Sequence, residues 1–304
     1  MAHLERLGDE EGAVWALRLV ANFYGWFGRG AEATKLLELA LERAERVSPR
    51  LVSEVLIWIC WGIWSGPLAT GAGISRCDEL LEQYGGSKRL EGTAVMMRGA
   101  QKAARGMVKE GRVDVAAGRG LFRELNDSIW WAGASMVEGE MELTAGDPQA
   151  AYDALSDGHG TLAESSETGY LATIVGLRAQ AALDLGREGE ALELAAETER
   201  VAAPDDLEPQ ARHRFVRAQV LARRGEFSAA DELIGEAAAL LDPTDLVIHQ
   251  LDLAFAQAEV ERLAGRPERE RTVLERALAI AEAKENLVAV SRAQALLVEI
   301  GPNS

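Results

Sequence analysis

Apolar residues recur three and four positions apart along almost the whole chain, which is the pattern of helices that bury one face. The segment 210–241, QARHRFVRAQVLARRGEFSAADELIGEAAALL, shows it twice, once on each side of Arg224-Gly225-Glu226. This predicts two helices folded back on each other. A single hairpin of this kind cannot cover its own apolar faces, so it needs copies of itself on either side. The period-two alternation that would indicate strands is absent from the sequence.

The copies can be counted from the glycine at the turn. Steps of 40, 39 and 40 residues separate the turn glycines of the clearest copies, Gly146, Gly186, Gly225 and Gly265. A small residue lies seven positions before each glycine, and an alanine lies five positions after the first three, with Glu270 breaking the rule. Small side chains at fixed offsets let paired helices approach closely. The same spacing extends the register back to Gly111 and Gly28, with one unit between them whose turn has degenerated around 67–73.

The pattern therefore predicts an all-α fold, a solenoid of about seven helical hairpins closed by one more helix. Such an array has one continuous core, so we expect the chain, 1–304, to be a single repeat domain. Prolines near the proposed helix starts support the boundaries, as at Ser48-Pro49, where serine is a helix cap and proline fits the first turn. The hairpins are predicted at 9–47, 48–84, 88–125, 129–165, 169–202, 208–241 and 245–284, and the closing helix at 286–299.

Hairpins with a small residue, a turn glycine seven positions later and an alanine five after that resemble tetratricopeptide repeats. The segments VLARRGEFSAADEL, RLAGRPERERTVLERALAIAE and AAPDDLEPQARHRFVRA resemble more specifically the C-terminal repeat regions of large bacterial signalling proteins. In those proteins the repeats follow an AAA-type or STAND-type ATPase coupled to a nucleotide cyclase or a helix-turn-helix output domain. The resemblance implies a right-handed superhelix. No ATPase, cyclase or DNA-reading segment is found here, so we expect either a sensor region of a longer protein or a free-standing relative.

Composition narrows the function classes. The net charge of −17 argues against unspecific nucleic-acid binding and against an acidic membrane surface as a partner. The most apolar run, LVSEVLIWICWGIW, is shorter than the roughly 20 residues that a helix needs to span a bilayer. Cys60 and Cys77 offer neither a disulfide framework nor a metal cluster, which fits a reducing compartment such as the cytoplasm. The N-terminal MAHLERLGDEEG has no apolar run, so no signal peptide is expected.

No motif predicts catalysis, a metal or a cofactor. Residues 66–75, GPLATGAGIS, place glycines at the spacing of a phosphate-binding loop, but Ala72 stands where the lysine belongs, and a degenerate repeat turn is the better interpretation. Asp205-Asp206 lack the third carboxylate of an aspartate-rich metal motif and fit a loop and a helix N-cap better. The histidines show no metal-binding spacing: His3, His159, His213 and His249. We therefore expect a protein that is not an enzyme.

All seven tryptophans lie in the first 131 residues. Three of them, Trp58, Trp61 and Trp64, are spaced three apart and so form a stripe on one helix face. We favour core packing under an irregular repeat as the interpretation. The alternative is an apolar interface for a ligand, a second subunit or a neighbouring domain.

The repeat register also predicts a binding surface. In tetratricopeptide-like stacks the first helix of each hairpin lines the concave face, and the position six before the turn glycine points into the groove. That position is polar in all six units where it can be read: Asn22, Arg105, Glu140, Gln180, Gln219 and Glu259. One turn earlier lie Arg18, Gln101, Met136, Gly176, Phe215 and Phe255. Toward the C-terminal end of the stack these residues are apolar and form an apolar strip in the groove. Such a groove suits a peptide or another elongated ligand. The alternative is that these polar side chains only contact solvent on an open inner face and bind no ligand.

The sequence therefore favours non-catalytic recognition: a sensor or scaffold that binds a peptide, a partner protein or a small ligand in the concave groove. As the resemblance implies, occupancy would be passed to an ATPase or output domain of the same polypeptide or complex. Two alternatives stay open. One is a self-association module that forms a homodimer through the tryptophan-rich half. The other is an all-α enzyme with an acidic central cavity.

Overall fold

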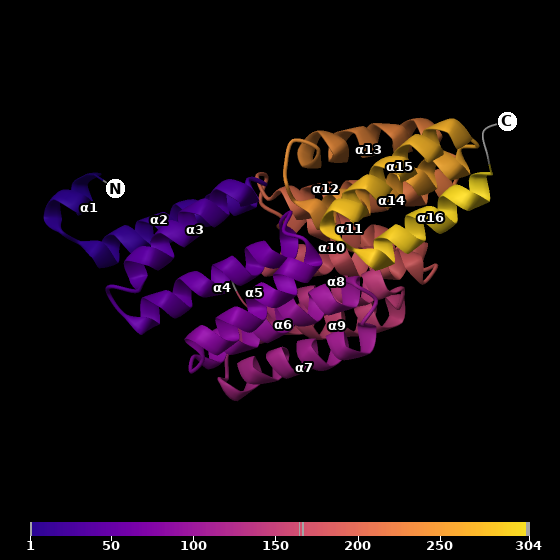
Figure 1. Ribbon diagram of the computed structural model, residues 1–304. Coiled ribbons are helices and arrows are strands. Elements are labelled where there is room, and N and C mark those ends of the chain that lie inside the picture. The colour runs from indigo at the N-terminus through magenta and orange to yellow at the C-terminus, as the bar shows by residue number, and fades with distance from the viewer. Residues whose placement is uncertain (1, 164, 166, 302–304) are drawn as a thin grey trace.

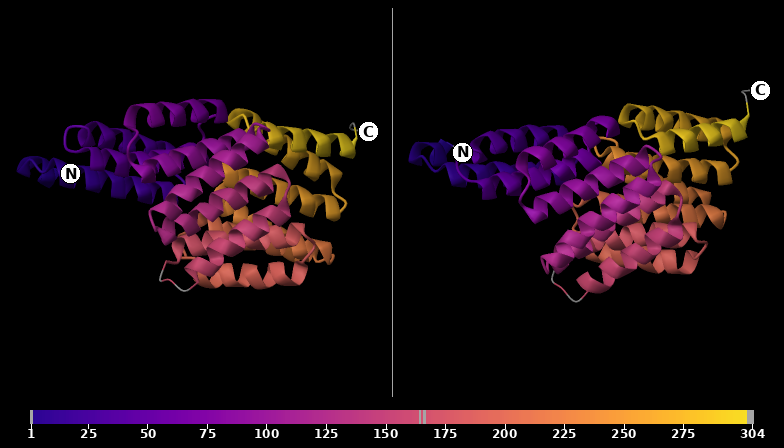
Figure 2. Two further views of the ribbon diagram at one scale, coloured as in Figure 1. Left: turned by 90° about the horizontal axis from the view of Figure 1, so that it is seen from below. Right: turned by 60° about the horizontal axis from the view of Figure 1, so that its bottom comes forward.

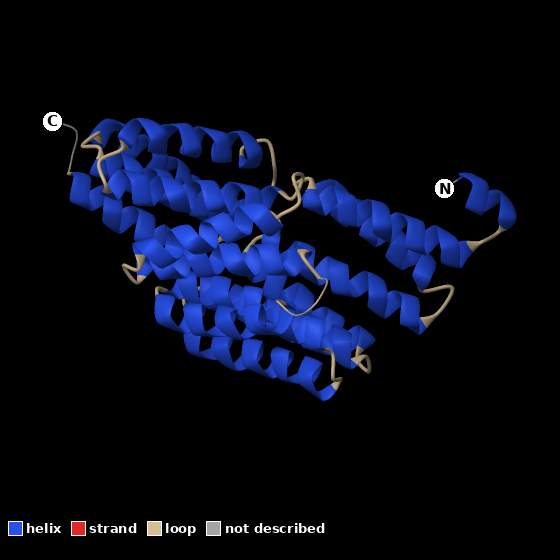
Figure 3. Cartoon of the chain, turned by 180° about the vertical axis from the view of Figure 1, so that it is seen from behind, coloured by secondary structure: helices blue, strands red, loops and turns tan. Residues whose placement is uncertain are grey.

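The computed structural model describes residues 2–163, 165 and 167–301, and every regular element in these ranges is a helix (Figure 1). Short loops connect the helices (Figure 3). The helices are α1 Ala2–Leu7, α2 Glu10–Trp26, α3 Gly30–Ala44, α4 Pro49–Ser65, α5 Thr70–Tyr84, α6 Lys88–Ala104, α7 Val108–Glu124, α8 Ser128–Ala145, α9 Pro148–Leu162, α10 Gly169–Asp184, α11 Glu188–Val201, α12 Leu207–Arg223, α13 Phe227–Leu241, α14 Val247–Leu263, α15 Pro267–Lys284 and α16 Leu287–Ile300.

Each even-numbered helix from α2 to α14 packs in a hairpin with the helix that follows it, and α16 closes the stack (Figure 1). This confirms the predicted all-α solenoid of seven hairpins and a closing helix. The short helix α1 was not predicted. The four clearest turn glycines adopt the left-handed conformation that a tight reversal needs and that glycine adopts without strain: φ is 79° at Gly146, 76° at Gly186, 81° at Gly225 and 67° at Gly265.

The predicted register of the third hairpin is wrong by five residues. Gly111 lies inside α7, and the left-handed turn residue is Gly106, with φ of 86°. Gly111 instead occupies the small position five after the turn, and Gly99 the one seven before it. A Cβ atom on Gly99 would lie 2.7 Å from the carbonyl oxygen of Gly111, so the two backbones touch. Arg105 consequently lies at the C-terminal cap of α6 rather than at the groove position.

The second hairpin also departs from the prediction. Its turn, expected around 67–73, is confined to the residues between Ser65 and Thr70, where the return helix α5 begins. The apolar run before it is the helix α4, as expected. A phosphate-binding loop would follow a strand, so this geometry agrees with a degenerate repeat turn. Cys60 and Cys77 are both buried as free thiols, and burial raises the pKa of Cys77 to about 12.

The C-terminal end of the stack returns toward the N-terminal half: in Figure 2 the yellow end of the chain lies beside purple and magenta helices, and α16 contacts α6 and α8. The α13–α14 loop places Asp245 at the start of α3, where its carboxylate accepts hydrogen bonds from the backbone N–H groups of Gly30 at 2.6 Å and Ala31 at 2.7 Å. At the end of α15 the buried ammonium of Lys284 donates to the carbonyl oxygens that end α4, those of Ile63, Gly66 and Leu68. No helix among the described residues is long and apolar enough to cross a membrane.

Candidate functional site

Four of the predicted groove residues meet at one cavity of about 90 Å³, which is bounded by α8, α10, α12, α14 and α16. These residues are Gln180, Gln219, Phe255 and Glu259. They come together because the repeat of 39 or 40 residues places equivalent side chains side by side on neighbouring first helices. The Nε2 group of Gln219 donates to a carboxylate oxygen of Glu259 at 2.5 Å, which joins α12 to α14.

The remaining predicted groove residues lie elsewhere. Met136 and Phe215 are buried in the core, so the apolar strip reaches the cavity only through Phe255. Asn22 is half-buried on α2. Arg105 contacts the returning C-terminal end, where it donates to a carboxylate oxygen of Glu285 at 2.5 Å. Glu140 lies beside the cavity in a separate buried cluster, described below.

Charged groups in the cavity are mostly held by partners from the protein. Arg223 donates two hydrogen bonds to Glu259, at 3.0 and 2.8 Å, and Arg212 donates to Asp252 at 2.7 Å. Asp184 differs. It is exposed to the cavity, but the surrounding protein desolvates its carboxyl group and raises its pKa, an effect that the hydrogen bond from Gln180 and the nearby Arg292 oppose.

A buried ion cluster adjoins the cavity and joins α8, α12 and α14. Its centre is Arg212, which is 1% exposed and pairs with Glu208, with Asp252 and, at 3.5 Å, with Glu140. Burial alone would lower the pKa of Arg212, but the three carboxylates raise it. Burial and the charge of Asp252 raise the pKa of Glu140 well above its ordinary value. Burial and the charge of Arg212 lower the pKa of His249 to about 4, which keeps this imidazole neutral near pH 7.

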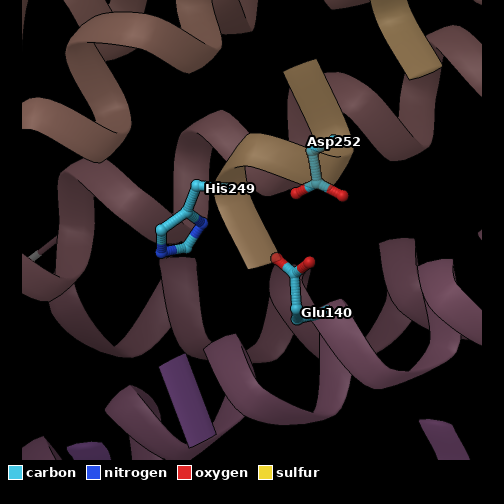
Figure 4. A group of neighbouring side chains, drawn as sticks. All are labelled: Glu140, His249 and Asp252. Carbon is cyan, nitrogen blue, oxygen red and sulfur yellow. The ribbon is translucent and has the colours of Figure 1, made fainter. Parts of the chain in front are cut away.

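Three members of this cluster have the composition of a metal site. Figure 4 shows Glu140, His249 and Asp252 facing one another, and one ligand atom from each lies within 4.8 Å of the others. The guanidinium of Arg212, however, already supplies the cation that these carboxylates need, so we assign Arg212 rather than a metal ion to this role. Sequence reasoning missed the cluster. Its local signal was the four-residue spacing of Glu208 and Arg212 on one helix, which also marks ordinary exposed pairs.

The tryptophan stripe lies largely in the core. Trp64 is buried, and Trp58 and Trp61 are half-buried against core residues, which agrees with the favoured interpretation. The ring of Trp61 contacts those of Trp64, Trp130 and Tyr170, with centroids 5.6, 6.4 and 6.2 Å away. These rings come from α4, α8 and α10, so the cluster joins first helices of different hairpins. This packing favours the core interpretation, and an interface formed by Trp58, Trp61 and Trp64 stays a prediction.

The exposed apolar surface of the N-terminal half is on α2 instead. Trp26 is 59% exposed, and it shares one helix face with other exposed residues: Leu19, Val20, Phe23 and Phe27. This α2 face is at the end of the stack, where no preceding hairpin covers it among the described residues (Figure 1). Nothing in the periodicity of α2 distinguished it from a helix that is covered on both sides.

No protein-family model and no curated protein sequence matches the chain. Among solved structures, the chain is similar to the apo form of the quorum sensor NprR from B. thuringiensis, with 14% identity, a TM-score of 0.53, and 100% of this chain and 84% of that chain covered. It is also similar to a Rap protein complexed with competence and sporulation factor, with 10% identity, a TM-score of 0.59, and coverage of 95% and 85%. Both are tetratricopeptide-like helical solenoids, and at these identities the likeness shows the fold alone.

Proposed function

We propose that the chain is a non-catalytic scaffold that binds an extended peptide or a segment of a partner protein on its inner face, at the cavity between α10, α12, α14 and α16. The observation that carries the proposal is the set of polar side chains at one repeat position, Gln180, Gln219 and Glu259, around one cavity. Burying a polar group without a partner costs roughly 1–3 kcal/mol. Oε1 of Gln219 nevertheless has no hydrogen-bond partner among the described residues, so this atom can accept a hydrogen bond from a ligand.

The signalling context supports the same proposal. Two of the similar structures are a quorum sensor and a Rap protein complexed with competence and sporulation factor, and both have this fold. Together with the resemblance of the repeat segments to bacterial signalling proteins, this favours a cytoplasmic sensor region of a bacterial regulator. Its occupancy would then be passed to an ATPase or output domain in the same polypeptide or complex.

Binding is favoured over catalysis by the state of the acidic groups. An enzyme that uses paired carboxylates needs both of them able to take part, one to exchange a proton and the other to attack or to activate water. In this cavity Asp252 is held by Arg212 and Glu259 by Arg223 and Gln219. These pairs leave Asp184 without a second free carboxylate among the described lining residues, so the all-α enzyme stays the less supported alternative.

The scaffold is tested with a random library of ten-residue peptides selected against the full chain. The double variant Gln180→Ala/Gln219→Ala removes two polar groups from the cavity and should weaken the selected peptides about tenfold or more, while circular dichroism remains that of the folded chain. The matched control is Gln149→Ala/Gln294→Ala, which removes two exposed glutamines outside the cavity. Equal affinities for the wild type and the cavity variant would contradict this site.

A second candidate function, self-association, is favoured by the α2 face. A solenoid end presents the surface on which a further hairpin would pack, and the same face of a second copy supplies a matching apolar helix through a two-fold axis. Sedimentation should then show a wild-type dimer, and Phe23→Ser/Trp26→Ser should give a folded monomer. A wild type that sediments as a monomer at all accessible concentrations would exclude this function.

A further inference from the structure

The cavity contains two acceptor groups whose capacity to accept hydrogen bonds is not filled by the described residues of the protein. The first is Oε1 of Gln219, a residue that is only 4% exposed, and this atom has no hydrogen-bond partner among the described residues. The second is the carboxylate of Asp184. It accepts a hydrogen bond from Gln180 at 2.9 Å and forms no ion pair with any residue that the structure describes. An ionised carboxylate has room for about four hydrogen bonds, so Asp184 has capacity for a ligand.

The other charges of the cavity are accounted for. Asp252 and Glu259 are paired with Arg212 and Arg223. The remaining cation is Arg292 of α16, whose guanidinium lies over the ring of Phe255, 4.2 Å from the centroid. Arg292 is exposed, so its long side chain can move aside at little cost. Its position shows that this wall of the cavity accommodates a planar cation against an aromatic ring.

We propose that the cavity binds the positively charged end of a ligand, an ammonium or a guanidinium group, with Asp184 as its counter-ion and Oε1 of Gln219 as a neutral acceptor. The inference rests on the proposed function, because it specifies the ligand chemistry for the same inner face. Ammonium and guanidinium groups are donors only, and so they match two acceptor groups with unfilled capacity. A charge-assisted hydrogen bond to a carboxylate is roughly twice as strong as a neutral one. The volume of about 90 Å³ suits the end of a side chain or of a peptide rather than a whole peptide.

The positive group can come from a lysine or arginine side chain or from a peptide N-terminus, and small probes separate these sources. N-acetyl-arginine methylamide and N-acetyl-lysine methylamide carry the charge on the side chain, whereas alanine methylamide carries it on the amine. N-acetyl-alanine methylamide is the neutral reference and N-acetyl-glutamate methylamide the anionic one. Titration of the full chain, followed by NMR, should show at least one cationic probe binding about tenfold more tightly than the neutral reference.

The variants assign the binding to this cavity. Asp184→Asn keeps the shape of the side chain and removes its charge, so the preference for the cationic probe should fall about tenfold. Gln219→Ala should give a smaller loss, because it removes a neutral acceptor. Asp153→Asn is the matched control: Asp153 of α9 is exposed and accepts the same type of hydrogen bond from a glutamine four residues earlier, Gln149, at 2.8 Å. This control should bind the probes as the wild type does.

The outcomes also separate this inference from the proposed function. Tighter binding of the glutamate probe, or unchanged cation binding by a folded Asp184→Asn variant, overturns the cationic assignment. The cationic assignment is also overturned if the binding of library peptides requires Gln180 and Gln219 but the peptides show no preference for lysine, arginine or a free N-terminus. That result would still support the peptide-binding scaffold. Cation binding that depends on Asp184, when the library yields no peptide at all, keeps the cation site and overturns the scaffold.

Discussion

The four hairpins from α8 to α15, here called the regular half, and the two hairpins from α2 to α5, the N-terminal half, are stabilised by different kinds of contact. In the later set each turn has a left-handed glycine, and each hairpin is covered by its neighbours on both sides. The buried ion cluster there is paired within the set, since Arg212 contacts carboxylates of α8, α12 and α14. The regular half is therefore stabilised mostly by contacts between adjacent repeats, as expected of a solenoid.

The packing of the N-terminal half depends on contacts with residues that are distant in the sequence. The turn between α4 and α5 has no left-handed glycine, and α2 leaves one apolar face uncovered. Its compensating contacts come from the returning C-terminal end: Asp245 caps α3, and Lys284 satisfies the carbonyl groups at the end of α4. The comparison teaches that an irregular repeat can be retained when the superhelix brings a distant loop to its unpaired backbone groups.

The tryptophans make this difference measurable. Five of the seven lie in α2 and α4, and Trp130 of α8 packs against Trp61 of α4, so their fluorescence reports mainly the N-terminal half, whereas circular dichroism reports helices throughout. Repeat arrays can lose two-state behaviour when part of the stack is destabilised. The relative midpoints of the two signals in a urea titration therefore distinguish a local loss from a loss across the whole stack.

The largest loss in the free energy of unfolding is expected from Arg212→Ala in the regular half. The change leaves Glu140, Glu208 and Asp252 close together without their cation, and breaking a buried ion pair in this way costs about 3–5 kcal/mol. The loss should appear in urea unfolding followed by circular dichroism. Arg217→Ala on the same helix is the control, because Arg217 pairs in solvent with Glu199 and should change the free energy of unfolding by at most about 1 kcal/mol. Similar losses in the two variants would mean that the buried cluster is not what joins α8, α12 and α14.

A smaller loss in the free energy of unfolding is expected from Lys284→Met, which removes the hydrogen bonds between the end of α15 and the end of α4. The variant leaves buried carbonyl groups at the end of α4 without a donor, at a cost of about 1–3 kcal/mol. Because the loss falls on the N-terminal half, the tryptophan fluorescence should change at a lower urea concentration than the circular dichroism does. Coincident midpoints would argue that the N-terminal hairpins do not depend on this contact.

The same residue predicts a pH dependence with a defined sign. Burial lowers the pKa of Lys284 to about 8, against an ordinary value of about 10.4 in an unfolded chain. Between these two values the unfolded chain binds the proton more tightly than the folded chain, so the contribution of this group to stability increases as the pH rises. The free energy of unfolding of the wild type, measured relative to Lys284→Met, should be level below pH 8 and rise toward pH 10.4. A fall over this window would contradict the lowered pKa, because it would mean that the carbonyl groups stabilise the ammonium group by more than burial destabilises it.

The smallest effect is expected from Asp245→Ala. It removes the carboxylate that caps α3 from a distant loop, and loss of such a cap costs about 0.5–2 kcal/mol. Fluorescence should again respond before circular dichroism. Asp147→Ala is the matched control, since Asp147 caps its own helix α9 inside the regular half, and there the two signals should shift together. Early fluorescence loss in both variants would show that the N-terminal half is simply the weaker part, whichever cap is removed.

Much of the fold could be predicted because its signals are local. The three-and-four spacing of apolar residues, the caps such as Ser48 and the turn glycines each act within one or two helical turns, so they can be read along the chain. The third hairpin shows the limit. Gly99, Gly106 and Gly111 are all compatible with a turn or a close helix contact, and only the packing of α6 on α7 decides which one reverses the chain.

The candidate site could be predicted in part for the same reason. Gln180, Gln219 and Glu259 share a repeat position, and the repeat brings them to one cavity with Phe255. Asp184 and Arg292 were missed because nothing in their local spacing marks them, and Arg105 was misplaced with the register of its hairpin. Met136 and Phe215 share the periodicity of Phe255 but are buried in the core, since neighbouring helices cover them.

By itself the sequence determined that the chain is an all-α stack of seven hairpins with a closing helix, because helix periodicity and glycine turns are properties of short segments. Only the tertiary structure decided that the stack returns on itself, that Asp245 and Lys284 meet helix ends about 215 residues away, and that Arg212 gathers carboxylates from three helices. The physical reason is that small rotations between successive hairpins accumulate along a solenoid. The sum of those rotations sets which distant groups meet, and no local pattern records that sum.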